Sequence, residues 1–147
     1  MSDISTIIDV PGVIAKLNRA RQMELDTISR YMQQHYYWTG AISDKIKEIA
    51  ITEMRHAEKL ADRIIALGGV PVSGSMGGKL DLTRRNQIFE DNTQLESDTV
   101  SLYTEYGKLC NDYHKDYDTM TLFAEIIAEE QEHHTWFEFV SMQPAEL

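Results

Sequence analysis

The 147-residue sequence is poor in cysteine, in basic residues and in long apolar segments. A single cysteine, Cys110, excludes an intrachain disulfide and any four-cysteine zinc or rubredoxin-type iron site. Lys and Arg number 14 against 24 Asp and Glu, which gives a net charge of -10 and argues against binding nucleic acid or an anionic membrane surface. No apolar stretch approaches the roughly 20 residues of a membrane span, and the N-terminus lacks the pattern of a signal peptide. We therefore expect a soluble, cytoplasmic, single-domain protein.

Apolar residues recur every three or four positions in four segments, which is the period of helices that bury one face. Pro11 suits the first turn of the first helix, and Gly40 is expected to be its C-cap. Ser43 or Asp44 is expected to cap the second helix. The fold class is therefore predicted to be all-α, with helices over these ranges: about 11–39, 43–67, 83–113 and 117–141.

A 15-residue segment, 68–82, separates the second predicted helix from the third and holds five of the eight glycines. At about 3.3 Å per residue, it is long enough to run the full length of a helix bundle. The other two connections are short turns near Gly40 and Tyr113. Two helical hairpins joined by one long crossover form the ferritin-like four-helix topology.

Each predicted helix places a glutamate on its apolar face, and two of these glutamates are followed three residues later by a histidine. Buried ionised carboxylates are very costly unless they are paired or coordinated, and no Lys or Arg shares these faces. Two divalent cations would balance four carboxylates, and this mixture of ligands suits Fe(II), Mn(II) or Zn(II). One Glu on each of two helices with a Glu-x-x-His on each of the others is the di-metal carboxylate pattern. The candidate ligands are Glu24, Glu53, His56, Glu96, Glu130 and His133.

The spacing of these residues supports a common site. In an antiparallel hairpin, ligands at the same height are equally far from the turn. Positions 24 and 56 are centred on Gly40, and positions 96 and 130 are centred on Tyr113, so both centres fall in predicted turns. Each half of the chain also repeats a Glu-x6-Tyr pattern, which ends at Tyr31 in the first half and at Tyr103 in the second. The two halves therefore read as pseudo-symmetric.

Several simpler or different assignments remain open at these residues. The glutamates could line solvated faces while the histidines and both tyrosines fill the core. On the fourth helix, Glu129 with His133, or Glu130 with His134, would also lie on one helix face. We favour Glu130 with His133, because these two share a face with the apolar residues of that helix.

The sequence resembles the bacterioferritins over residues about 10–140. Glu53-Met54-Arg55-His56-Ala57 is similar to the family's Glu-Met-x-His-Ala motif, and Glu24-x6-Tyr31 is similar to its first-helix pattern. Glu130-x-x-His133 followed by Trp136 resembles its fourth-helix motif. The resemblance implies iron storage by a ferroxidase, an enzyme whose di-iron centre oxidises Fe(II) with O2 or H2O2. The ferric product would then be stored as a mineral inside a cage.

By the same resemblance, each candidate ligand has an expected role. Glu24 and His56 would hold one iron, and Glu96 and His133 would hold the other. Glu53 and Glu130 would bridge the two. Tyr31 would lie beside the centre as a hydrogen-bond or redox partner.

Met54 is the most specific match to the family. It follows Glu53 by one residue and therefore points about 100° away from the site, toward the outside of the bundle. In bacterioferritins the methionine at this position, one from each subunit of a two-fold dimer, ligates a haem iron. The resemblance thus implies haem b or a related iron porphyrin shared between two subunits, whereas the simpler reading is interface packing.

The sequence departs from typical bacterioferritins after the fourth helix. Typical members carry a short fifth helix that packs at the four-fold axes of a 24-subunit cage, whereas Leu147 is only 14 residues past His133. We therefore expect a homo-oligomer built from two-fold dimers, with 12 subunits favoured over 24. Because the sequence shows no basic tail, we do not expect DNA to be a partner.

Two other functions fit the same site. One is a di-iron peroxidase that resembles the rubrerythrin branch and does not store iron. The other is a dimeric, non-enzymatic carrier of metal or haem.

Overall fold

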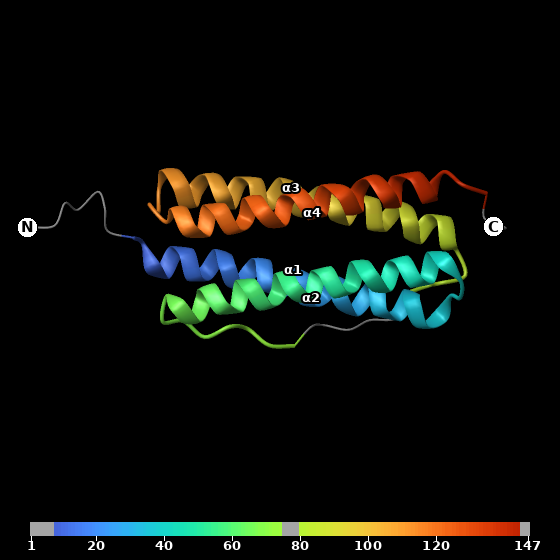
Figure 1. The fold of residues 1–147 in the computed structure, drawn as a ribbon, viewed down its shortest axis with the longest axis horizontal. Helices are drawn as coiled ribbons and strands as arrows, with labels where there is room; N and C mark the ends of the chain where they lie inside the picture. The colour runs from blue at the N-terminus through green and yellow to red at the C-terminus, as the bar shows by residue number, and fades with distance from the viewer. Residues whose placement is uncertain (1–7, 75–79, 145–147) are drawn as a thin grey trace, which may run out of the picture.

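The computed structural model describes residues 8–74 and 80–144, so residues 75–79 of the predicted crossover and both chain ends lie outside the described part. Two antiparallel hairpins lie alongside each other, one formed by α1 and α2 and the other by α3 and α4 (Figure 1). The predicted all-α, four-helix architecture is confirmed. Among the described residues, none of the helices is long and apolar enough to cross a membrane. The helices are α1 (Val10–Tyr37), α2 (Ala41–Ala66), α3 (Arg85–Asp112) and α4 (Tyr117–Ser141).

The turn between α1 and α2 differs from the expectation at Gly40. Trp38 is the C-cap of α1 in an extended conformation, and Gly40, with φ 92°, is the N-cap of α2. The indole of Trp38 packs edge-on against Phe89, with ring centroids 5.2 Å apart, and donates to the carbonyl of Leu82 at 3.3 Å. Docking this ring on the second hairpin requires the chain to leave the helix before Gly40.

The expected side-chain cap of α2 is also wrong. Because α2 begins at Ala41, Ser43 and Asp44 both lie inside its first turn, and no side chain caps its N-terminus. The Ser43 hydroxyl donates instead to the carbonyl of His35 at 2.8 Å, one of the carbonyls left free at the end of α1. Ser43 therefore ties the two helices together across the turn.

The crossover runs from the end of α2 to the beginning of α3, at opposite ends of the bundle (Figure 1). Polar side chains of α1 hold its backbone. Asn18 accepts the N–H of Val72 at 2.8 Å, and Arg21 donates to the carbonyl of Val72 at 2.9 Å. Further along, Gln33 accepts the N–H of Leu80 at 2.9 Å. The first helix thus fixes both described parts of the crossover.

α3 begins at Arg85, two residues later than expected. The carboxylate of Asp81 accepts the backbone N–H and the hydroxyl of Thr83 at 3.2 and 2.6 Å. This Asx turn satisfies the backbone locally and keeps these residues out of the helix.

The core consists of two apolar clusters, one toward each end of the bundle. The first contains Val13, Leu17, Ala20, Leu60, Ile64, Tyr103, Cys110, Phe123 and Ile126. The second contains Tyr31, Ile46, Ile49, Ala50, Phe89, Phe137 and Val140. Between these clusters, the buried residues of α1, α3 and α4 are polar, and those of α2 are Glu53, His56 and Ala57.

A partly buried ion pair ties α2 to the beginning of α4. Asp116 is the N-cap of α4 and accepts the N–H and the hydroxyl of Thr119 at 3.1 and 2.6 Å. Arg63 of α2 donates to the same carboxylate at 2.8 Å and to the Thr119 hydroxyl at 3.0 Å. Burial alone would raise the pKa of Asp116, but Thr119 and Arg63 outweigh it and hold that pKa below its usual value.

We predict that Asp116→Ala lowers the free energy of unfolding by about 2–4 kcal/mol, because it removes a helix cap and leaves Arg63 without its partner. Chemical denaturation of the metal-free protein measures this. Asp118→Ala, an exposed change in the same helical turn, is the matched control and should cost only a few tenths of a kcal/mol. Equal losses for both variants would contradict the assigned role of Asp116.

Candidate metal centre

The six candidate ligands meet at mid-bundle, between the two apolar clusters. α1 and α3 each contribute one glutamate, whereas α2 and α4 each contribute a Glu-x-x-His pair. Five of the six residues are at most 1% exposed, and His133 is 8% exposed. A spacing of three residues places both members of each pair on one face of their helix, and this directs them to the same point.

The ligand atoms form two overlapping groups. Glu24, Glu53, His56 and Glu130 each offer one atom to the first group, and Glu53, Glu96, Glu130 and His133 do so for the second. Within each group all offered atoms lie within 4.8 Å of one another. Only Glu53 and Glu130 belong to both groups, which is the arrangement needed for two ions that share two carboxylates.

Each ligand also keeps a buried polar atom that has no hydrogen-bond partner among the described residues. Such atoms are rare in folded proteins, because leaving one unsatisfied costs about 1–3 kcal/mol. Six of them around one point therefore indicate that a ligand belongs there, and the mixture of carboxylate oxygens and imidazole nitrogens fits Fe(II) or a similar divalent cation. The atoms are Glu24 Oε2, Glu53 Oε1, His56 Nδ1, Glu96 Oε2, Glu130 Oε1 and His133 Nδ1.

Each histidine lies close to one of the two carboxylates that belong to both groups, without a hydrogen bond to it. His56 Nδ1 lies 2.9 Å from Glu130 Oε1, and His133 Nδ1 lies 2.8 Å from Glu53 Oε1. None of these four atoms has the geometry of a hydrogen bond. The two atoms of each pair therefore face the same space at the centre of the site.

Two buried tyrosines hold the glutamates of α1 and α3. Tyr31 donates to Glu96 Oε1 at 2.6 Å, and Tyr103 donates to Glu24 Oε1 at 2.9 Å. Burial and the neighbouring carboxylates raise the pKa of both phenols well above the ordinary value, so both remain donors. One oxygen of each glutamate is therefore held by a tyrosine from the opposite hairpin, and the other oxygen stays available.

Without metal, the site retains protons. Burial disfavours the charged rings, but the nearby carboxylates outweigh it and raise the pKa of His56 to about 10 and of His133 to about 9. Burial together with the neighbouring carboxylates raises the pKa of Glu53 and Glu96 well above the usual range. For Glu130, burial alone would raise the pKa, but the adjacent side chains of Glu96, His133 and His56 outweigh it and lower that pKa.

We predict that loading the site with two divalent ions near pH 7 releases at least two protons, because both histidines are protonated below about pH 9 when metal is absent. The apparent affinity should therefore strengthen as the pH rises from 6 to 8. Calorimetric Zn(II) titrations in two buffers that differ in ionisation enthalpy measure the released protons. A binding enthalpy that is the same in both buffers would contradict the prediction.

Met54 and His134 lie away from this centre. Met54 is 41% exposed on the outer face of α2. His134 is partly exposed, with Nε2 3.9 Å from Glu138 Oε2, so Glu130 pairs with His133 at the site as the shared helix face predicted.

Glu129 is the functional candidate that the sequence reasoning missed. Its Oε1 lies 3.3 Å from His56 Nε2, whereas the sequence considered Glu129 only as a partner of His133. Its side chain is 45% exposed and lies off the apolar face of α4, so helical periodicity gives no signal for it.

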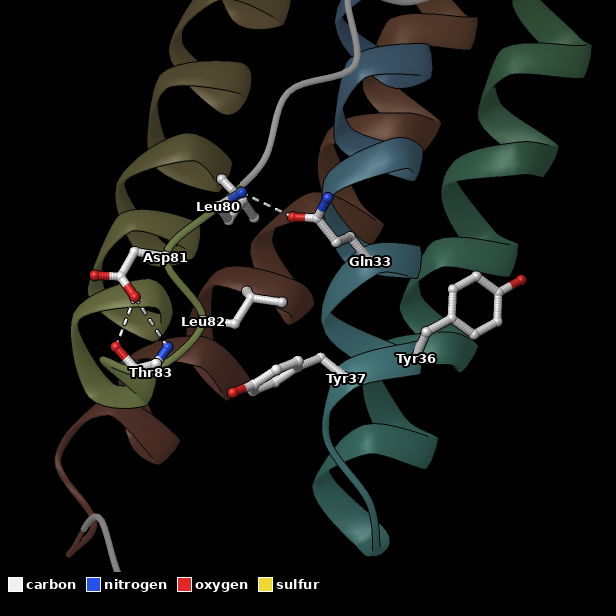
Figure 2. Close-up of a pocket in the computed structure, with 7 residues that line it drawn as sticks. All are labelled: Gln33, Tyr36, Tyr37, Leu80, Asp81, Leu82 and Thr83. Carbon is white, nitrogen blue, oxygen red and sulfur yellow. Dashed lines mark hydrogen bonds between the residues drawn. The ribbon is translucent and has the colours of Figure 1, made fainter.

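A surface groove at the C-terminal end of α1 lies apart from the candidate metal ligands. It encloses ≈ 590 Å³ between α1 and the last residues of the crossover, and Tyr37 lies beside Leu82 in it (Figure 2). None of the six candidate ligands lines the groove.

Comparison with known proteins agrees with this geometry. The model of the ferritin-like domain family matches residues 14–141. Bacterioferritin from Desulfovibrio desulfuricans is 41% identical over 130 residues, which cover 86% of this chain and 72% of the relative. The chain belongs to the bacterioferritin family.

Solved structures of bacterioferritins and related proteins have the same fold. The crystal structure of Desulfovibrio desulfuricans bacterioferritin, which was solved with its di-iron site in different catalytic states, superposes with a TM-score of 0.85 at 39% identity. That match covers 90% of this chain and 79% of the other. The dodecameric thioferritin of Bacteroides fragilis, a bacterioferritin-related protein, has a TM-score of 0.76 at 26% identity and covers 92% and 86% of the two chains.

Proposed function

We propose that this bacterioferritin is a ferroxidase that stores iron: it oxidises Fe(II) with O2 or H2O2 at the mid-bundle centre, and the ferric product enters a mineral inside an oligomeric cage. The observation that carries the proposal is the set of six buried, unpartnered ligand atoms arranged in two groups. A purely structural core rarely keeps six polar atoms buried without hydrogen-bond partners, because each costs about 1–3 kcal/mol.

The ligands divide naturally between two ions. Glu24 and His56 would hold one ion, and Glu96 and His133 would hold the other. Glu53 and Glu130 reach both groups and would bridge them. When bound, the two Fe(II) ions supply one electron each, so that with two protons they reduce one H2O2 to two water molecules.

The remaining groups position the ligands and exclude water. Tyr31 and Tyr103 keep their protons and hold the carboxylates of Glu96 and Glu24. The apolar clusters above and below the site seal it along the bundle axis, which strengthens every electrostatic interaction inside. Protons displaced by the incoming ions leave the histidines and carboxylates of the site.

The proposal predicts two phases when Fe(II) is added in air to the metal-free protein. A fast phase should end near two Fe per subunit, and a slow phase should then load many more. Ferric absorbance, followed by size exclusion with iron counting, measures both. Glu53→Ala and Glu130→Ala should each slow the fast phase by at least about 10-fold, because each removes a ligand from both ions.

Glu138→Ala, an exposed change on the same helix as Glu130, is the control and should leave both phases intact. Oxidation no faster than in buffer would refute the ferroxidase. Oxidation that stops at two Fe per subunit would leave the site but exclude storage. In that case, H2O2 consumption would favour the rubrerythrin-like peroxidase, and its absence would favour the carrier.

We also propose that Met54, one from each subunit of a two-fold dimer, ligates a haem iron. Met54 lies in a groove of ≈ 440 Å³ on the outer face of α1 and α2, beside Leu25, Ile28 and Ala57. Ile51 and Ile65 add apolar surface to the same face of α2, at 36% and 61% exposure. A hollowed, exposed apolar face supports a dimer interface with room for a flat apolar ligand.

Met54→Leu is therefore expected to abolish axial ligation of haem by sulfur while leaving Fe(II) oxidation at wild-type rate. Haem titrations of the full-length protein, followed by visible absorbance, measure this. Met142→Leu, at a methionine that is 70% exposed, is the matched control. Unchanged haem spectra in the Met54 variant would refute the assignment.

For the assembly we propose a cage of 12 subunits built from such dimers. The dodecameric Bacteroides fragilis relative supports this number, because its chain shares most of its length and its fold with this one. Light scattering distinguishes the alternatives: a mass near two subunits would instead fit the carrier.

A further inference from the structure

The two histidines have matching positions on their helices but different surroundings. Each follows its bridging glutamate by three residues, and each directs Nδ1 toward the site. The residue immediately before the bridging glutamate differs between the halves. It is Glu129 on α4 and Thr52 on α2.

On the His56 side, Glu129 reaches the outer nitrogen of the ring. The distance from His56 Nε2 to Glu129 Oε1 is 3.3 Å, and His56 itself is fully buried. A carboxylate that accepts the Nε2–H leaves the lone pair on Nδ1, turns the ring toward the metal and makes Nδ1 a stronger ligand.

On the His133 side, no equivalent acceptor exists among the described residues. The Thr52 hydroxyl donates instead to the carbonyl of Glu48 at 3.3 Å, within its own helix. His133 is 8% exposed and lines a surface groove of ≈ 220 Å³ together with Thr52, Trp136 and Glu129, whereas His56 does not line it. Water therefore reaches this ligand, whereas it does not reach His56.

We propose that Glu129 is a positioning residue that makes the two metal positions unequal. The position formed by Glu24 and His56 binds a divalent cation tightly and holds it. The position formed by Glu96 and His133 binds the second cation more weakly and exchanges it through the groove. The proposal rests on the proposed function, since it requires that the six ligands bind metal.

Stepwise binding of Co(II) tests the proposal, with the visible d–d absorbance of the metal-free full-length protein as the signal. The wild type should bind two ions in two steps of different affinity. His56→Ala should remove the tight step, and His133→Ala should remove the weak one. Glu129→Ala should weaken the tight step by about 10- to 100-fold, so that the two steps merge.

Three further variants test whether the charge of Glu129 and its contact with His56 cause the tight binding. Glu129→Gln keeps an acceptor oxygen but loses the charge, so its loss should be smaller than that of Glu129→Ala. Thr52→Glu supplies the missing carboxylate on the other side and should tighten the weak step. Glu132→Ala removes an exposed carboxylate from the same groove without contacting His56, and it should leave both steps unchanged.

A spectroscopic readout checks the tautomer directly. In the Zn(II)-loaded protein with 15N-labelled histidine, the His56 signal should show a protonated Nε2 that exchanges slowly with water. Glu129→Ala should accelerate this exchange, and Glu132→Ala should not.

The outcomes of the two proposals are distinguishable. Binding of fewer than two Co(II) by the wild type would refute the di-metal site itself. Two ions bound with equal affinity, a Glu129→Ala titration identical to the wild type, or a loss confined to the weak step would each overturn the role of Glu129 alone.

Discussion

The constraint that governs this structure is the cost of placing four carboxylates in the middle of a helical bundle. An ionised carboxylate that leaves water without a partner costs several kcal/mol even after relaxation, and in the described part of the chain these four form ion pairs only with histidines. In the absence of metal, the raised pKa values of His56, His133, Glu53 and Glu96 keep protons in the site and so reduce this cost. The fold also confines the polar residues to one layer, with a continuous apolar cluster on each side. The two clusters supply the apolar packing, and the six candidate ligands lie in the layer between them.

That layer also joins the hairpins. Tyr31 of α1 bonds to Glu96 of α3, and Tyr103 of α3 bonds to Glu24 of α1. One turn from Tyr31, the buried amides of Gln34 and Asn92 exchange two hydrogen bonds, at 3.1 and 2.7 Å. Polar contacts are directional, so they fix the height at which α1 and α3 face each other, which apolar packing alone would leave less precise. The hydrogen bonds that position the ligands therefore also align the two hairpins with each other.

Helical periodicity made much of this predictable from the sequence. A glutamate among apolar residues is informative because burial conflicts with its charge, and this conflict marked Glu24 and Glu96 on faces where the structure buries them. The same reasoning could not find Glu129, because its side chain is 45% exposed and a charged residue on an exposed helix face is ordinary in an acidic protein. The end of α1 was misplaced for a related reason. The sequence shows that Gly40 tolerates a left-handed conformation, but not that the ring of Trp38 docks on Phe89 and ends the helix earlier.

The repeat in the sequence explains why the inner layer is symmetric, and burial explains why the surroundings are not. Inside the bundle, any change to one half must still satisfy buried carboxylates, so the two Glu-x6-Tyr and Glu-x-x-His patterns keep the same form. The residues that precede Glu53 and Glu130 reach the solvent and need not satisfy a buried carboxylate. These two positions can therefore differ, and they are Thr52 in one half and Glu129 in the other. A symmetric pair of ligand groups can thereby hold two ions differently. In our proposal, the buried side around His56 would retain its ion, and the side around His133, which is 8% exposed, would exchange iron with the solvent.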